Sequence, residues 1–275
     1  MATTDAEQIK KAVNDRYGAI AKEHLVQKPF SIPLMDLSAC CGPSMGTISS
    51  AIEIAVAKGY SAGELQIFPD TVTEVSLGCG NPTALAQIVA GDTVLDLGSG
   101  GGLDCFLAGE RVGPTGHVIG LDMNENMLDL ANSNAKKMGV TNVEFRRGEM
   151  EAMPVVDSSV DLIISNCVIN LSPDKDVVFK EAFRVLRPGG RLCVSDIVVE
   201  GEIPEETRVS LAEWASCAAG ALEKGEFIQK LEAAGFTNIQ IASQEITKKG
   251  IELKESGWDK GVLLSAVITA VKPAV

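Results

Sequence analysis

The chain has 275 residues, and its 24 basic and 37 acidic side chains give a formal net charge of −13. This balance argues against a nucleic-acid partner, because phosphate binding relies on a surplus of Lys and Arg. With only two histidines, sites that depend on this residue, such as Ser-His-Asp triads, are also disfavoured. Residues 1–13 lack the apolar core of a secretory signal, and the apolar stretch Val262–Val271 is too short to span a bilayer. We therefore expect a cytoplasmic protein with no membrane segment, whose seven cysteines are thiols rather than structural disulfides.

From about Thr93 onward, short apolar runs alternate with longer amphipathic stretches. The runs predict five strands, at Val94–Leu97, His117–Leu121, Asn142–Arg146, Asp161–Ser165 and Arg191–Ile197. Helices are expected between these strands. The first follows the glycine loop and runs through Glu110, the second covers Asn124–Met138 with Gly139 as its C-cap, and the third covers Asp176–Leu186 and ends before Pro188-Gly189-Gly190. This alternation predicts an α/β fold, a doubly wound, Rossmann-like parallel sheet covered on both faces.

The pattern changes on either side of this region. Helices are predicted over Glu205–Leu222 and Lys224–Ala234, followed by strands at Phe236–Ile241 and Val262–Val271 that should form an antiparallel pair at the sheet edge. Before the first strand, helices are expected near Asp5–Glu23 and Ile48–Lys58. We therefore expect a helical cap with cysteine loops over residues 1–80, and a domain over 81–275 whose insertion at about 202–234 covers the pocket.

A glycine loop follows the first strand, in the run Asp96-Leu97-Gly98-Ser99-Gly100-Gly101-Gly102. Glycine allows tight turns and a close approach of the backbone to a ligand. A dinucleotide fingerprint would need glycine at position 103, and Leu103 disfavours a nicotinamide cofactor. Asp122 ends the second strand, where an acidic side chain can hold two ribose hydroxyls. Because strand, loop, helix, strand and acid follow in this order, a nucleotide-type cofactor explains Asp96 and Asp122 better than a role as turn residues.

These motifs resemble those of the class I S-adenosylmethionine-dependent methyltransferases. The resemblance implies that the glycine loop contacts the methionine part of the cofactor, that Asp122 holds the ribose, and that the segment at 148–150 contacts the adenine. The cofactor-binding residues that it implies are Asp96, Gly98, Ser99, Gly100, Gly102, Asp122, Met123, Gly148, Glu149, Met150 and Asn166.

The cysteines fall into different settings. Cys167 comes at the carboxyl end of the fourth strand, where ligands lie in such sheets, so we favour a functional role for it. Cys79 lies in an irregular Gly-Cys-Gly loop, which favours neither structure nor function, and Cys217 lies on an expected small-residue helix, which by itself favours packing. Two further cysteines, Cys105 and Cys193, are predicted core residues.

Cys40 and Cys41 are adjacent and end in Gly42-Pro43. They lack the Cys-x-x-Cys spacing of a zinc knuckle, so we expect no zinc. An exposed pair that binds a soft ion or exchanges with a disulfide, and an ordinary surface pair, all fit this pattern.

Taken together, the motifs resemble one branch of that family, the arsenite methyltransferases. The residues that carry the resemblance are Tyr17-Gly18, Cys40-Cys41, Leu77-Gly78-Cys79-Gly80-Asn81-Pro82, Asn166-Cys167-Val168-Ile169-Asn170-Leu171-Ser172-Pro173 and Cys217-Ala218-Ala219-Gly220. The resemblance implies that Cys79, Cys167 and Cys217 bind trivalent arsenic and that Cys40 or Cys41 is an additional redox cysteine. It further implies methyl transfer from S-adenosylmethionine to arsenite and methylated arsenicals, with a thiol reductant such as glutathione or a thioredoxin-like protein.

Two alternatives stay open. One is a small-molecule C- or O-methyltransferase on the same fold, in which the cysteines only pack. The other is a module that binds arsenicals without turnover, and it would bind arsenite without consuming the cofactor.

Overall fold

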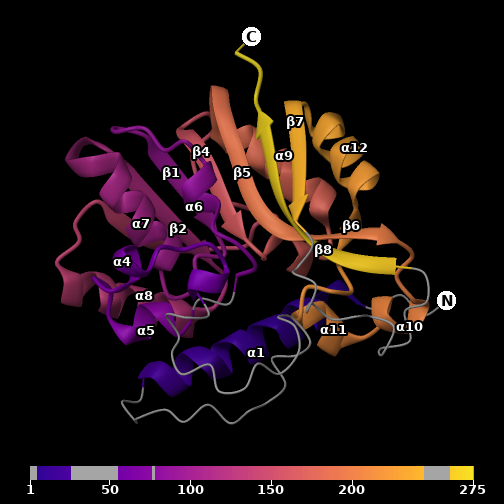
Figure 1. Ribbon diagram of the computed structural model, residues 1–275, viewed down its shortest axis with the longest axis horizontal. Helices are drawn as coiled ribbons and strands as arrows, with labels where there is room; N and C mark the ends of the chain where they lie inside the picture. The colour runs from indigo at the N-terminus through magenta and orange to yellow at the C-terminus, as the bar shows by residue number, and fades with distance from the viewer. Residues whose placement is uncertain (1–4, 26–54, 76–77, 245–260, 275) are drawn as a thin grey trace.

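The structure, a computed structural model, describes residues 5–25, 55–75, 78–244 and 261–274, which form one mixed sheet with helices on both faces (Figure 1). The strands are β1 (Thr93–Leu97), β2 (His117–Asp122), β3 (Val143–Arg147), β4 (Val160–Asn166), β5 (Leu186–Gly201), β6 (Leu222–Glu223), β7 (Thr237–Gln244) and β8 (Gly261–Val271). The helices are α1 (Ala6–Leu25), α4 (Ala62–Leu65), α5 (Asp70–Thr73), α6 (Pro82–Leu85), α7 (Leu103–Val112), α8 (Glu125–Met138), α9 (Lys175–Val185), α10 (Glu205–Arg208), α11 (Leu211–Ala215) and α12 (Lys224–Ala234), with 3-10 turns η1 (Gly113–Thr115) and η2 (Ile169–Leu171). No helix within these ranges is long and apolar enough to cross a membrane.

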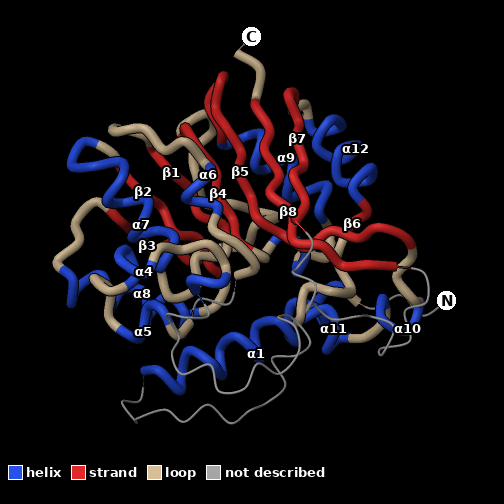
Figure 2. The backbone as a smooth tube through the Cα atoms, in the orientation of Figure 1, coloured by secondary structure: helices blue, strands red, loops and turns tan. Residues whose placement is uncertain are grey.

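The sheet has the strand order β3-β2-β1-β4-β5-β8-β7, with β6 paired to the far end of β5 (Figure 2). Strands β1 to β5 pair in parallel, and β8 pairs antiparallel with both β5 and β7. This arrangement confirms the predicted doubly wound sheet and the antiparallel edge pair. Because the chain leaves β1 first toward β2 and later toward β4, the carboxyl ends of β1 and β4 flank the switch point, where such sheets bind ligands.

Two apolar cores lie on opposite faces of the sheet. Leu95 on β1 belongs to the core that contains Phe179 of α9, whereas Val94 belongs to the core that contains Phe106 of α7. Successive side chains of a strand point to opposite faces, so this alternation assigns α9 and α7 to different faces. The continuous apolar runs in the sequence reflect burial on both sides, as expected for parallel strands.

Local capping signals explain why several helices begin and end where the sequence predicts. The Asn124 side chain accepts a hydrogen bond from the Met127 amide at 3.1 Å and caps α8, which ends at Gly139 in a left-handed conformation. Gly235 ends α12 in the same way, with φ of 104°. Both glycines adopt positive φ without the steric penalty that a side chain would add.

The predicted helix over Glu205–Leu222 is wrong. The structure has two short helices there, α10 and α11, and Leu222 forms a parallel bridge with β5 instead. The Ser210 side chain accepts from the Glu213 amide and starts a new helix, which interrupts the expected one. A Cβ on Gly220 would collide with the Asn170 carbonyl, so the small residues after α11 serve close loop packing rather than helix formation. Strand β5 is also longer than predicted, because it begins at Leu186 and includes the Pro-Gly-Gly segment.

Some expected features lie outside the described residues. These are Cys40, Cys41 and most of the helix predicted near Ile48–Lys58, of which the described residues 55–57 are helical.

Helix α1 passes below the strand ends in Figure 1, on the side opposite the C-terminus. Lys10 of α1 pairs with Glu149 at 2.6 Å and with Glu151 at 3.3 Å, both in the segment after β3. On the other side, the side-chain amide of Asn124 donates to the backbone carbonyl of Asn14 at 2.8 Å. These contacts join the N-terminal helix to the carboxyl ends of β2 and β3.

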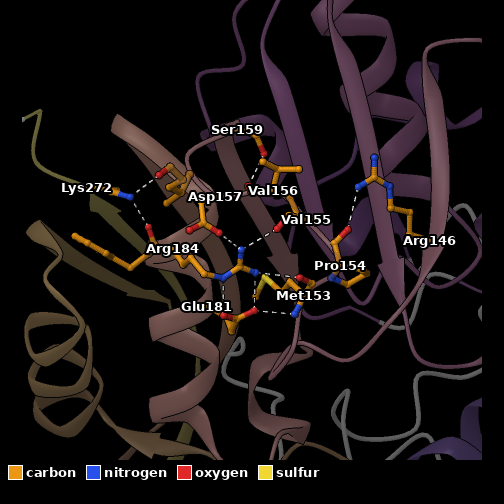
Figure 3. A network of polar contacts seen from close by, with 12 residues as sticks. Arg146, Met153, Pro154, Val155, Val156, Asp157, Ser159, Glu181, Arg184 and Lys272 are labelled. Atoms are coloured by element: carbon orange, nitrogen blue, oxygen red, sulfur yellow. Dashed lines mark hydrogen bonds and ion pairs between the residues drawn. The ribbon is translucent and has the colours of Figure 1, made fainter.

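Arg184 on α9 holds the segment that leads from β3 to β4 (Figure 3). Its guanidinium donates to the carbonyls of Met153 at 3.0 Å and Val155 at 2.8 Å, and it pairs with Glu181. Glu181 in turn accepts from the Met153 amide at 2.8 Å. Residues 148–151 directly precede this anchored segment, so the network also fixes their position; they line the cavity described below.

Candidate active site

A cavity of about 1100 Å³, its open mouth included, lies at the carboxyl ends of β1, β2 and β4. It is therefore at the switch point that the sequence indicates. Of the predicted cofactor-binding residues, all except Gly102 line it: Asp96, Gly98, Ser99, Gly100, Asp122, Met123, Gly148, Glu149, Met150 and Asn166. Helix α1 contributes Lys10, Val13, Asn14 and Tyr17 to the opposite wall, which sequence reasoning did not assign.

The glycines of the loop after β1 have different tasks. Gly98, Gly100 and Gly102 all have positive φ, of 69°, 50° and 96°. A Cβ on Gly98 would collide with Val168, and one on Gly102 would lie 2.8 Å from the Phe106 ring, whereas one on Gly100 would meet nothing within 4 Å. Gly98 and Gly102 therefore serve packing, and Gly100 presents bare backbone to the cavity.

The loop is held by the acid at the end of β2. Asp122 accepts from the Gly100 amide at 2.9 Å and from the Asn124 amide at 2.8 Å. Burial raises the pKa of this carboxyl. Asp122 thus organises the loop as well as lining the cavity.

Two further carboxyls lie behind the loop. Burial and the nearby charge of Asp104 raise the pKa of Asp96 well above its ordinary value, and Asp96 accepts a hydrogen bond from the Cys105 thiol. Burial raises the pKa of Asp104 to about 6, although it accepts from the Tyr60 hydroxyl at 2.8 Å. Asp104 also lines the cavity, although the sequence analysis did not select it. The signal available in the sequence was its position in the first helical turn after the glycine loop.

Asn166 at the end of β4 clamps the loop that carries Cys79. Its side-chain oxygen accepts from the Cys79 amide at 2.9 Å, and its nitrogen donates to the Gly80 carbonyl at 2.7 Å and to the Tyr60 hydroxyl at 2.9 Å. A Cβ on Gly78 would collide with Asn166 itself. The Gly-Cys-Gly sequence is therefore what allows this loop to lie against the strand ends.

The clamp places Cys79 beside Cys167, and the structure joins their sulfurs in a disulfide with Cα atoms 5.7 Å apart. The expectation that the cysteines are thiols is thus wrong for this pair. The physical reason is proximity, because the Cα separation lies in the range that a disulfide can bridge. Cys79 and Cys167, two of the three cysteines that the family resemblance implies as arsenic ligands, thus lie together in an oxidised form.

Cys217 approaches the pair from the segment after α11 rather than from a helix. Its thiol donates to the Cys167 carbonyl at 3.1 Å, and both residues have positive φ, of 69° and 60°. The other two described cysteines, Cys105 and Cys193, are buried core residues, as predicted.

A carboxyl that sequence reasoning missed lies next to the disulfide. Among the described residues, one carboxylate oxygen of Asp196 and the sulfurs of Cys79 and Cys167 lie within 4.8 Å of one another. Burial raises the pKa of Asp196 to about 7, and burial lowers that of neighbouring Lys175 to about 8. The Lys175 ammonium lies 5.0 Å above the ring of Trp214. An acidic residue within an otherwise apolar strand was the signal for Asp196.

Known proteins with these features are methyltransferases. The methyltransferase domain family matches residues 88–235. An arsenite methyltransferase of Halobacterium salinarum is 41% identical over the whole chain, which spans 69% of that protein. The chain belongs to the arsenite methyltransferase family. The mouse arsenite methyltransferase is 30% identical over 89% of the chain and 62% of its own length. The crystal structure of an arsenic(III) S-adenosylmethionine methyltransferase from Chlamydomonas reinhardtii has a TM-score of 0.62 at 35% identity, over 82% of this chain and 74% of that one.

The cavity of this arsenite methyltransferase family member fits S-adenosylmethionine, the cofactor of the family. The Ser99 hydroxyl is buried in the cavity wall and has no hydrogen-bond partner among the described residues. Three carboxyls, those of Asp96, Asp104 and Asp122, line the same wall, which suits a ligand with positive charge. Gly100 leaves room for the ligand against the loop backbone.

Proposed function

We propose that this protein transfers a methyl group from S-adenosylmethionine to trivalent arsenic held by the thiolates of Cys79, Cys167 and Cys217. The observation that carries the proposal is the meeting of these cysteines at the edge of the cavity, since Cys167 lines the cavity and contacts both of the others. Soft thiolates bind soft As(III) in preference to the hard oxygen ligands of carboxylates.

The main contribution of the protein to this reaction is to position the arsenic relative to the methyl donor. When bound, S-adenosylmethionine supplies a methyl group on a sulfonium that becomes a neutral leaving group. The acceptor is the lone pair of arsenic, which carries no proton, so no general base is needed. Fixing the arsenic on three side chains converts an encounter into an intramolecular reaction, for which effective molarities of ~10⁵ M or more are known.

The loops supply this placement. Asn166 fixes the Cys79 loop, the backbone amide of Cys167 donates to the Ser195 carbonyl at 2.7 Å, and Gly220 packs closely on the Asn170 carbonyl. The cysteines are therefore held by three separate strand ends and loops, all at one edge of the sheet.

Arsenic binding needs the reduced form of the Cys79–Cys167 pair. We therefore include a thiol reductant in the proposal, glutathione or a thioredoxin-like protein, which gives two electrons to the disulfide and becomes a disulfide itself. Such reductants are abundant in the cytoplasm, where we place the reaction. The role of Cys40 or Cys41 as an additional redox cysteine rests on the sequence alone and stays a proposal.

The test is incubation of the reduced protein with arsenite, glutathione and S-adenosylmethionine, followed by chromatographic speciation of arsenic. We expect methylated arsenic with the wild type, and loss of it in Cys167→Ser and Cys217→Ser with cofactor affinity kept. Cys193→Ser is the matched control, because Cys193 is buried in the core on the α7 face of the sheet. Full activity of Cys167→Ser would refute the arsenic site, and arsenite binding without methylation would favour a sequestering module.

A further inference from the structure

A buried carboxyl, that of Asp196, lies next to the Cys79–Cys167 pair. Asp196 is 1% exposed, and its carboxylate is fixed by the backbone amides of Ile197 at 2.8 Å and Asn170 at 3.2 Å. The Ile169 amide is a third backbone donor to this carboxylate, and because a carboxylate has about four acceptor positions, the three bonds leave room for a further partner. The side chain is thus both anchored and able to bind a further partner.

The Cys217 sulfur is not one of the three donor atoms of this cluster. Its thiol is turned to the Cys167 carbonyl, and within the described part of the chain it is not a member of the group whose ligand atoms all lie within 4.8 Å. Two donor sets therefore overlap at Cys79 and Cys167: one of three sulfurs, and one of two sulfurs and an oxygen. Three thiolates suit the pyramidal As(III), whereas two thiolates, one carboxylate and a water suit a tetrahedral ion of borderline softness.

We propose that the reduced protein binds Zn²⁺ through Cys79, Cys167 and Asp196, and that the ion competes there with arsenite. Donor atoms in a tetrahedral zinc site are roughly 3.5–3.8 Å apart, so the cluster needs small side-chain movements once the disulfide is opened. Both Cys167 and Asp196 are buried. Cys167 directly follows β4 and Asp196 lies within β5, so both are placed by rigid elements of the sheet.

The chemistry balances without an unnamed reactant. An external thiol or phosphine gives two electrons to the disulfide, and each sulfur takes up a proton. Zn²⁺ then displaces both thiol protons, with any proton on Asp196, to the solvent, and no electron moves. The three bound anions exceed the ion by one negative charge, and the buried ammonium of Lys175, which attracts the Asp196 carboxylate, compensates for it.

The experiment is calorimetric titration of the protein, kept reduced with a phosphine, with Zn²⁺ and separately with arsenite. We expect Asp196→Asn to weaken Zn²⁺ by at least ~10-fold, the scale on which even indirect zinc partners act, and to leave arsenite affinity within about twofold. Cys217→Ser should do the reverse. Asp92→Asn is the matched control, because Asp92 is also buried but pairs with Arg191 at the other end of the sheet.

Co²⁺ bound to the wild type gives a second readout that no substitution can disturb. The intensity of its thiolate charge-transfer absorption should correspond to two thiolates. Three thiolates, or equal Zn²⁺ affinity in wild type and Asp196→Asn, would overturn the proposal. Only the competition rests on the proposed function: Zn²⁺ binding with no arsenite binding would refute that function and leave the zinc site standing.

Discussion

Gly100 offers a direct test of the cofactor cavity, because the chain contains a matched glycine elsewhere. Gly100 and Gly139 both have positive φ, of 50° and 67°, and a Cβ on either would meet nothing within 4 Å. Alanine in a left-handed conformation costs ~1–2 kcal/mol, so both variants should lose that much unfolding free energy. Each kcal/mol corresponds to a fall in Tm of roughly 2–4 °C for a chain of about this size.

The two positions differ only in what the new methyl group faces. Gly100 lines the cavity and Gly139 caps the far end of α8. Forcing an extra methyl into a filled site costs ~1–3 kcal/mol, so Gly100→Ala should weaken S-adenosylmethionine by ~5- to 150-fold. The Gly100 amide that donates to Asp122 is retained, so the loop keeps its anchor.

Urea unfolding of both variants and calorimetric titration with S-adenosylmethionine measure the two effects separately. Gly139→Ala should bind the cofactor like the wild type despite a similar loss of stability. If Gly100→Ala also keeps wild-type affinity, the loop does not hold the cofactor and the cavity has another ligand. An equal loss of affinity in both variants would attribute the effect to general destabilisation.

Two further predictions concern the groups around the cavity. Burial raises the pKa of Asp104 to about 6, so this carboxyl is neutral below that pH and negative above it. Affinity for the cationic cofactor should therefore fall by up to ~10-fold from pH 7 to pH 5. Titrations with the cofactor at both pH values should show this fall in the control variant Asp92→Asn and a much smaller fall in Asp104→Asn. Asn166→Ala removes the clamp on the Cys79 loop, so the fraction of Cys79–Cys167 disulfide at a fixed glutathione ratio should fall at least ~5-fold, as mass spectrometry of alkylated cysteines can measure. Asn132→Ala, which loses only a bond to the Leu128 carbonyl in its own helix, should leave the disulfide unchanged, and the same result for Asn166→Ala would contradict the clamp.

The parallel part of the fold was predictable because its signals are local. Apolar runs mark each strand, and Asn124 and Gly139 mark the ends of α8 by side-chain capping and by positive φ. These signals need no knowledge of the rest of the chain. The strand order then follows from the alternation of strands and helices, and with it the edge of the sheet where Asp122 and Cys167 lie.

The segment after β5 was not predictable in this way. Its residues favour a helix, but Ser210 restarts the chain and Gly220 packs against a carbonyl of η2, a contact distant in sequence. The place of Cys217 depends on that packing. Tertiary contacts therefore overrode the helix propensity of this segment. Only the family resemblance had indicated that Cys217, which lies in it, is a functional residue.

Asp196 and Asn166 illustrate a second limit. The sequence placed Asn166 at a strand end and suggested cofactor contact, yet its amide is occupied mainly by the backbone of the Cys79 loop. The sequence did not indicate Asp196, because the direction of a side chain within a strand depends on register and on the loops that cover it. Both residues show that the sequence locates the edge of the sheet but does not assign partners along it.

The backbone of the site supports a functional reading of its cysteines. Cys167 and Cys217 have φ of 60° and 69°, a region that glycine occupies with less strain. Strained conformations persist where the surrounding structure holds them, and they concentrate at sites whose side chains are needed for chemistry. Among the described non-glycine residues, Gln87, Ser158 and Asn238 also have positive φ, but Cys167 and Cys217 are the two that a hydrogen bond joins, from the Cys217 thiol to the Cys167 carbonyl, beside the cavity.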